Sequence, residues 1–201
     1  MNYLAHAYLS FNQPELVVGN IISDFIKGKK QYDYPLPIQN GIQLHRAIDT
    51  FTDNHEAVRQ AKLYLKPAVG LYSGAFVDIV FDHYLALDTT CFESVNALAV
   101  FAENTYTTLE NNQEWFPENF KKMFPYMKQN NWLYNYQFAW GIEKSFANIA
   151  RRAAYLSSSE ECFKLWEVNY DNIHQLYKLF FPQLKEYISE HLGTIRKDNY
   201  K

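Results

Sequence analysis

Apolar residues recur at three- and four-residue intervals along most of the chain, which is the spacing of helices with one buried face. The stretch 136–156 shows this pattern clearly, with Phe138, Ile142 and Phe146 placed on one side. Prolines and asparagine pairs interrupt it, and no stretch alternates apolar and polar residues as a half-buried strand does. The pattern predicts helices over residues 2–11, 14–27, 37–64, 68–87, 91–110, 115–128, 136–156 and 159–191, the last bent near Pro182, with a loop over 29–35.

These segments predict an all-α, single-domain helical bundle over residues 1–192, followed by a polar, frayed tail over residues 193–201. A chain of 201 residues that is 48% hydrophobic has enough apolar material for the core of one domain. The net charge of −3 argues against a general nucleic-acid binder. We expect no membrane span, because no run of about 18 uncharged apolar residues occurs, and no signal peptide. The two cysteines form no CxxC pair, which favours a reduced, cytoplasmic setting.

The segment 74–86 is almost wholly apolar, yet it carries Asp78, Asp82 and His83. A buried carboxylate is costly unless its charge is compensated. Two carboxylates one helical turn apart also share a face and repel each other. A bound cation would resolve both problems, so the segment predicts a metal site inside a helical protein.

Residues of the same kind occur upstream. His45 and Asp49 are four apart and share a helix face, Asp24 lies near the end of an apolar helix, and His6 lies in an apolar first helix. A lone histidine such as His6 is more often a hydrogen-bonded core residue, and His45 with Asp49 is also compatible with a simple neighbour pair on a wet face. Mixed imidazole and carboxylate ligands suit Mn, Fe, Zn or Mg.

Several cations are candidates for binding a phosphate ester or an acidic partner. A metal-assisted hydrolysis of a phosphate ester needs positive charge against the phosphate oxygens and a carboxylate that acts as general base. Asp49 and Asp78 are the candidates for the base, although the cationic clusters also fit ordinary solvated helix faces. The candidate cations are Lys27, Arg46, Arg151 and Arg152.

Four N-terminal motifs, in order, resemble the acyl carrier protein phosphodiesterases, and the pair Arg151-Arg152 is similar to a later helix of that family. That family is all-helical and is a distant relative of the HD-domain phosphohydrolases, so the resemblance implies an HD-domain-like fold. The motifs are Asn2-Tyr-Leu-Ala-His6, Gly19-Asn-x-x-x-Asp24-Phe, Gly41-Ile-x-x-His45-Arg-x-Ile-Asp49-x-x-Thr-Asp53-Asn and Asp78-x-x-x-Asp82-His83-Tyr-Leu.

The resemblance implies Mn-dependent removal of 4′-phosphopantetheine from a serine of holo acyl carrier protein, an acidic partner, to give the apo form. It also implies metal ligation by His6, Asp24, His45, Asp82 and His83, with Asp49 and Asp78 as additional ligands or the base. Lys27 stands where the family usually has arginine, and residues 88–135 match it poorly. The alternatives are therefore an HD-like phosphohydrolase acting on a nucleotide or another small phosphodiester, and a binding module without catalysis.

Overall fold

The computed structural model describes residues 1–156 and 158–198, and within them it contains α-helices and 3-10 turns but no strand. The all-α prediction is confirmed. The 3-10 turns are Ser23–Phe25, Gly28–Asp33, Gly70–Tyr72 and Gln113–Trp115. The α-helices are α1 Tyr3–Tyr8, α2 Pro14–Ile22, α3 Leu36–Asn54, α4 Glu56–Val69, α5 Ser73–Leu87, α6 Val95–Glu110, α7 Glu118–Gln129, α8 Trp132–Asn135, α9 Ala139–Arg152, α10 Glu160–Val168 and α11 Tyr170–Asp198.

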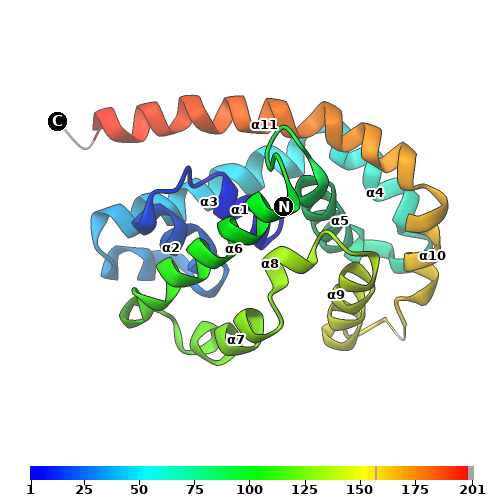
Figure 1. Cartoon of the computed structure of the whole chain (residues 1–201), viewed down its shortest axis with the longest axis horizontal. Helices are drawn as coiled ribbons and strands as arrows, with labels where there is room; N and C mark the ends of the chain where they lie inside the picture. The colour runs from blue at the N-terminus through cyan, green and yellow to red at the C-terminus, as the bar shows by residue number, and fades with distance from the viewer. Residues whose placement is uncertain (157, 199–201) are drawn as a thin grey trace.

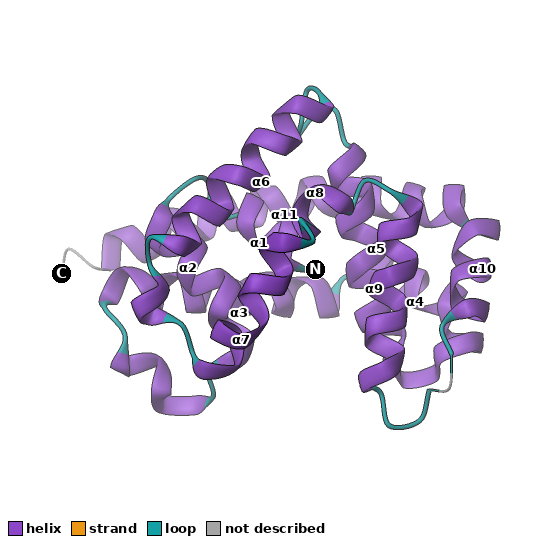
Figure 2. Ribbon diagram, turned by 60° about the horizontal axis from the view of Figure 1, so that its bottom comes forward, coloured by secondary structure: helices purple, strands orange, loops and turns teal. Residues whose placement is uncertain are grey.

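The helices form two groups joined along one side by the long helix α11 (Figure 1). Helices α2, α3, α6 and α7 lie toward one end and α4, α5, α9 and α10 toward the other (Figure 2). Helix α5 contacts α1, α4, α9 and α11, and all of its residues from 79 to 86 are buried. A helix that is apolar on every side is stable only when other elements surround it, which explains the central place of α5.

Two predicted long helices are each divided. The predicted helix 37–64 breaks at His55, whose backbone is extended (φ −79°, ψ 134°) and whose Nδ1 accepts the Ala57 amide at 3.2 Å to begin α4. The predicted helix 159–191 breaks at Asn169, between α10 and α11. Neither break has a proline or glycine, so neither interrupts the periodic pattern.

Other boundaries also shift. The turn Ser23–Phe25 replaces the last part of the helix predicted over 14–27, and the predicted loop 29–35 largely forms the turn Gly28–Asp33. Helix α11 continues through Pro182 to Asp198, so residues 193–198 of the expected tail are helical. The last residues of that tail, 199–201, lie outside the described part of the chain.

Helices α2 and α3 approach until their backbones touch, at Gly19 and Gly41. A Cβ atom on Gly19 would lie 2.1 Å from the Ile38 carbonyl oxygen, and one on Gly41 would lie 2.6 Å from the Leu16 carbonyl oxygen. Only glycine permits so close an approach. This contact places the end of α2 against the middle of α3, where the polar residues predicted for the site are found.

One stretch, Glu56–Leu87, is long and apolar enough to cross a membrane by length and composition alone. It comprises α4, the turn Gly70–Tyr72 and the core helix α5. Core helices of water-soluble proteins meet the same criterion, so this is weak evidence for a span.

Candidate metal centre

Four of the predicted site residues converge where α1, α2 and α3 meet. The Nε2 atom of His45 lies 3.0 Å from an Asp49 carboxylate oxygen and 3.1 Å from an Asp24 carboxylate oxygen. The Nε2 atom of His6 lies 3.4 Å from the other Asp49 oxygen. One potential ligand atom each from His6, His45 and Asp49 falls within 4.8 Å of the others.

A single buried asparagine, Asn20, positions both imidazoles. Its side-chain oxygen accepts from Nδ1 of His6 at 2.7 Å, and its backbone oxygen accepts from Nδ1 of His45 at 2.8 Å. Its own amide group donates to the His6 carbonyl oxygen and to Ser10 Oγ. With the protons fixed on Nδ1, both Nε2 atoms turn toward Asp49, as metal-ligating histidines do when their second nitrogen is held by a partner.

No role was predicted for Asn20 from the sequence. The sequence does mark it as unusual, because it is a polar residue within the apolar run Leu16–Ile22. In the structure its side chain is fully buried. A buried amide must find hydrogen-bond partners, so such a residue indicates a polar network. The sequence does not indicate that this network holds the two histidines.

The two imidazoles stack with 4.1 Å between ring centres, and their pKa values are shifted in opposite directions. Burial, together with the neighbouring His45 charge, lowers the pKa of His6 to about 4. Burial also opposes charge on His45, but hydrogen bonds to Asp24 and Asp49 outweigh it and raise the pKa of His45 to about 9. Without metal, one proton therefore occupies the space between His45 and the carboxylates that a cation would take.

The donor set fits a divalent metal. The imidazole side chains are 5% and 6% exposed, whereas the Asp49 and Asp24 side chains are 43% and 67% exposed, so the cluster is buried on one side and open on the other. Burial acts to raise the pKa of Asp49, but hydrogen bonds from His45 and His6 hold it well below its ordinary value. Two imidazoles with ionised carboxylates and an open side suit Mn, Fe or Zn.

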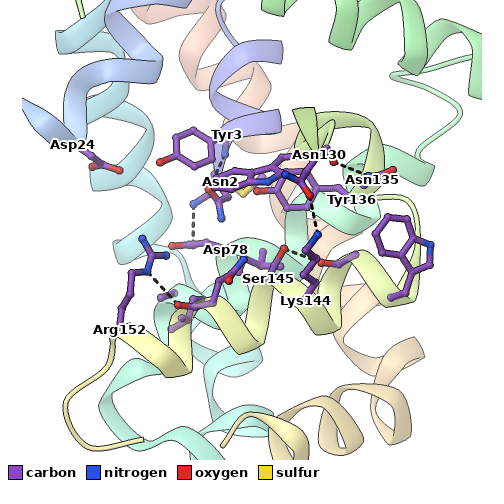
Figure 3. A pocket seen from close by; sticks show the side chains of 18 residues that line it. Asn2, Tyr3, Asp24, Asp78, Asn130, Asn135, Tyr136, Lys144, Ser145 and Arg152 are labelled. Carbon is purple, nitrogen blue, oxygen red and sulfur yellow. Dashed lines mark hydrogen bonds and ion pairs between the residues drawn. The ribbon is translucent and has the colours of Figure 1, made fainter. Parts of the chain in front are cut away.

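Asp78 lies beside this cluster. Its Oδ1 atom accepts a 2.8 Å hydrogen bond from the Met1 α-amino group. It lines two adjoining cavities: a smaller one of about 170 Å³ that contains the cluster, and a larger one of about 280 Å³ between α1, α5, α8 and α9. Met1, Asp24 and Asp78 line both, so the cavity of the cluster adjoins the larger one, where Figure 3 shows Asp24 and Asp78.

The structure places Asp82 and His83, both predicted as metal ligands, outside the cluster and gives each of them other hydrogen-bond partners. The fully buried Asp82 accepts hydrogen bonds from the backbone amides of Asn2, Leu4 and Ala5, so it caps the start of α1. The Nδ1 atom of His83 donates to the Tyr136 carbonyl oxygen at 2.7 Å, and its Nε2 atom lies 3.0 Å from the Tyr170 hydroxyl. Backbone dipoles and a phenol thus satisfy the polar groups for which a cation was expected.

The predicted phosphate-binding cations are also separated. Arg152, at the end of α9, lines the larger cavity, whereas the adjacent Arg151 contacts Asn148 Oδ1 and does not line it. Arg46 is exposed and donates to Gln31 Oε1 at 2.7 Å, and Lys27 is exposed at the start of the same turn. Of these residues, only Arg152 shares a cavity with the open side of the cluster.

Comparisons with known proteins identify the family of this chain. The family model described as "Acyl carrier protein phosphodiesterase" matches residues 1–184. Proteins with that name from Photorhabdus laumondii, Klebsiella pneumoniae strain 342 and Pectobacterium atrosepticum are 28%, 27% and 28% identical, each over 92% of this chain and 94%, 95% and 96% of their own. No solved structure matches the chain. The chain belongs to the acyl carrier protein phosphodiesterase family.

Proposed function

We propose that this protein is a metal-dependent phosphodiesterase that removes 4′-phosphopantetheine from holo acyl carrier protein. The family and the names of its relatives supply the substrate. The observation that carries the metal dependence is the group formed by His6, His45 and Asp49, with Asp24 on its open side. We propose that these four residues hold the ion, with manganese as the first candidate and Mg, Fe or Zn as alternatives.

The residues around the cluster have separable roles in the proposed reaction. A divalent ion held there would lower the pKa of a bound water and polarise a phosphoryl oxygen. With Asp49 taken as a ligand, Asp78 is the carboxylate left to accept the proton of the attacking water. Burial raises the pKa of Asp78 above its ordinary value despite the opposing Met1 ammonium, which suits a base. Arg152, across the cavity, supplies positive charge for the phosphate oxygens.

The bond changes follow from the products. The water oxygen forms a bond to phosphorus, and the bond between phosphorus and the carrier-protein serine oxygen breaks. The serine oxygen takes up a proton and leaves as the hydroxyl of the apo protein, so the phosphate stays on the pantetheine arm.

A basic surface beside Asp24 suits an acidic protein substrate. Lys27, Lys29 and Lys30 are exposed on or next to the turn Gly28–Asp33, and Arg46 is tied to that turn through Gln31. Such a surface speeds association with an acidic partner even though the whole chain carries a net charge of −3. We place the reaction in the cytoplasm, where free thiols such as those of this chain remain reduced.

The test is to incubate the purified protein with holo carrier protein and each divalent metal in turn, and to weigh the products. We expect apo carrier protein and free 4′-phosphopantetheine in equal amounts with at least one metal, and none after chelation. Asp49→Asn should lose bound metal and turnover together, whereas Glu56→Gln, an exposed carboxylate paired with Arg59, should retain both.

Two results would redirect the proposal. Turnover of nucleotide or other small phosphodiesters with none on carrier protein would assign the site to that substrate class. Binding of carrier protein with no turnover of any phosphate ester would leave a binding module whose cluster holds a structural ion or none.

A further inference from the structure

The cavity beside the cluster of His6, His45, Asp49 and Asp24 has walls of two kinds. Its volume is about 280 Å³, and it runs from Asp24 and Asp78 along α9 toward Trp140. In Figure 3, Asp24 and Arg152 lie at one end, while Lys144, Asn130 and Asn135 lie at the other. The cavity is therefore elongated, with one end at the cluster and the other away from it.

Aromatic side chains form much of the apolar wall. Tyr3 and Trp132 pack with 6.2 Å between ring centres, and Tyr136 is buried beside them. Trp140 is 51% exposed at the rim and stacks on Phe138. Aromatic side chains of this kind supply the apolar surface of ligand-binding pockets.

Amide and cationic groups line the rest of the cavity. Asn135 and Asn148 supply amide groups, and Lys144 donates to Asn130 Oδ1 at 2.9 Å. Arg152 Nε donates to the Asn148 carbonyl oxygen at 3.2 Å, which leaves its terminal nitrogens toward the cluster end. The lining thus offers a cation at each end, Arg152 near the cluster and Lys144 away from it, with amide groups and apolar surface along its length.

We propose that this cavity binds the pantetheine arm of the substrate, with its phosphate near Arg152 and its thiol end toward Trp140 and Lys144. The inference rests on the proposed function and extends it by naming the subsite. The arm carries a phosphate, a gem-dimethyl group and amides, and the cavity lining offers a cation, apolar surface and amide groups to match them. Because the phosphorus must lie at the cluster during cleavage, the attached arm must occupy space that adjoins it, and this cavity does.

The proposal also explains how substrate and product are distinguished. The serine and the carrier protein leave on one side of the phosphorus, and the phosphorylated arm remains in the cavity. 4′-Phosphopantetheine should therefore bind to the free enzyme and compete with holo carrier protein, whereas apo carrier protein should compete weakly.

A cavity-filling variant with a matched control tests the proposal. Ala75 is exposed on α5 and lines the cavity, whereas Ala147 is exposed on α9 and does not line it. Ala75→Trp should therefore obstruct the arm without entering the core, and Ala147→Trp adds the same side chain elsewhere. Calorimetry with metal-free protein measures binding of 4′-phosphopantetheine, and AMP serves as a phosphate ester without the arm.

We expect Ala75→Trp to weaken 4′-phosphopantetheine binding by about tenfold or more, about 1.4 kcal/mol. The metal content and the urea midpoint of Ala75→Trp should equal those of Ala147→Trp. The KM for holo carrier protein should rise in Ala75→Trp and stay unchanged in Ala147→Trp. Equal affinities in the two variants would overturn the subsite, and so would AMP binding as tightly as 4′-phosphopantetheine. Both results leave carrier-protein cleavage itself intact, whereas absent cleavage with selective arm binding would overturn the proposed function and not the subsite.

Discussion

Replacing Asp82 separates a structural role for this carboxylate from a metal-binding one. In the structure its Oδ2 atom accepts from the Leu4 amide at 2.8 Å and the Ala5 amide at 3.4 Å, and its Oδ1 atom accepts from the Asn2 amide at 3.0 Å. Asp82→Ala leaves these donors without a partner in a site with no solvent exposure. We therefore expect the variant to fold with reduced stability and to keep its metal.

The magnitude follows from the amides that lose their partner. A buried donor left unsatisfied costs about 1–3 kcal/mol. The Leu4 bond is short and buried, the Ala5 bond is long, and the Asn2 bond is partly buried, so the sum is roughly 2–5 kcal/mol. That loss is a large fraction of the 5–15 kcal/mol typical of a domain, without exceeding it. Asp82→Asn keeps one acceptor oxygen and should lose less.

Urea unfolding followed by far-ultraviolet circular dichroism measures the loss, and elemental analysis of the folded fraction measures the metal. Glu56→Gln, which alters an exposed carboxylate paired with Arg59, controls for the removal of a charge. A midpoint equal to that of the unmodified protein, or loss of metal at unchanged stability, would refute the capping role and return Asp82 to the metal site.

Three further predictions follow from the packing and the protonation of the site. Gly19→Ala should lower the free energy of unfolding, measured in urea, by about 1–3 kcal/mol and should reduce metal content, because the added Cβ would lie 2.1 Å from the Ile38 carbonyl oxygen. Gly74→Ala is the control: its Cβ would meet only a flexible lysine side chain, so neither stability nor metal content should change. His83→Phe should lower stability by about 1–3 kcal/mol at full metal occupancy, through loss of its bond to the Tyr136 carbonyl oxygen; equal loss of metal would contradict this. The urea midpoint of metal-free protein should peak near pH 6.5. The midpoint should fall as the pH rises toward 9, because His45, whose pKa is raised in the folded state, loses its proton there. It should also fall as the pH drops toward 4, because the pKa of His6 is lowered in the folded state, so the unfolded chain binds a proton that the folded state does not. A midpoint that does not change from pH 5 to 9 would show that neither shift exists.

The sequence predicted the helical fold and the convergence of His6, Asp24, His45 and Asp49, because periodicity and residue type carry that information. It did not predict the break at His55, where a histidine side chain caps the next helix without help from proline or glycine. Local patterns rarely show such caps.

The positions of Asp82 and His83, outside the cluster, were not predicted, for a different reason. The sequence correctly marked both as polar groups in a buried helix, and both are 3% exposed or less. Burial requires compensation, but the compensating partners are backbone amides and a carbonyl far along the chain. Every residue has these groups, so composition does not reveal which ones a buried side chain meets.

The dependence of both imidazoles on Asn20 has a consequence for metal preference. One residue holds His6 through its side-chain oxygen and His45 through its backbone oxygen, so neither ring can be reoriented without disturbing the packing of α1, α2 and α3. The carboxylates face water and have room to adjust. If the proposed metal centre is shared by homologous proteins, differences in metal choice should therefore arise at the positions of Asp24 and Asp49, while the nitrogen donors stay constant.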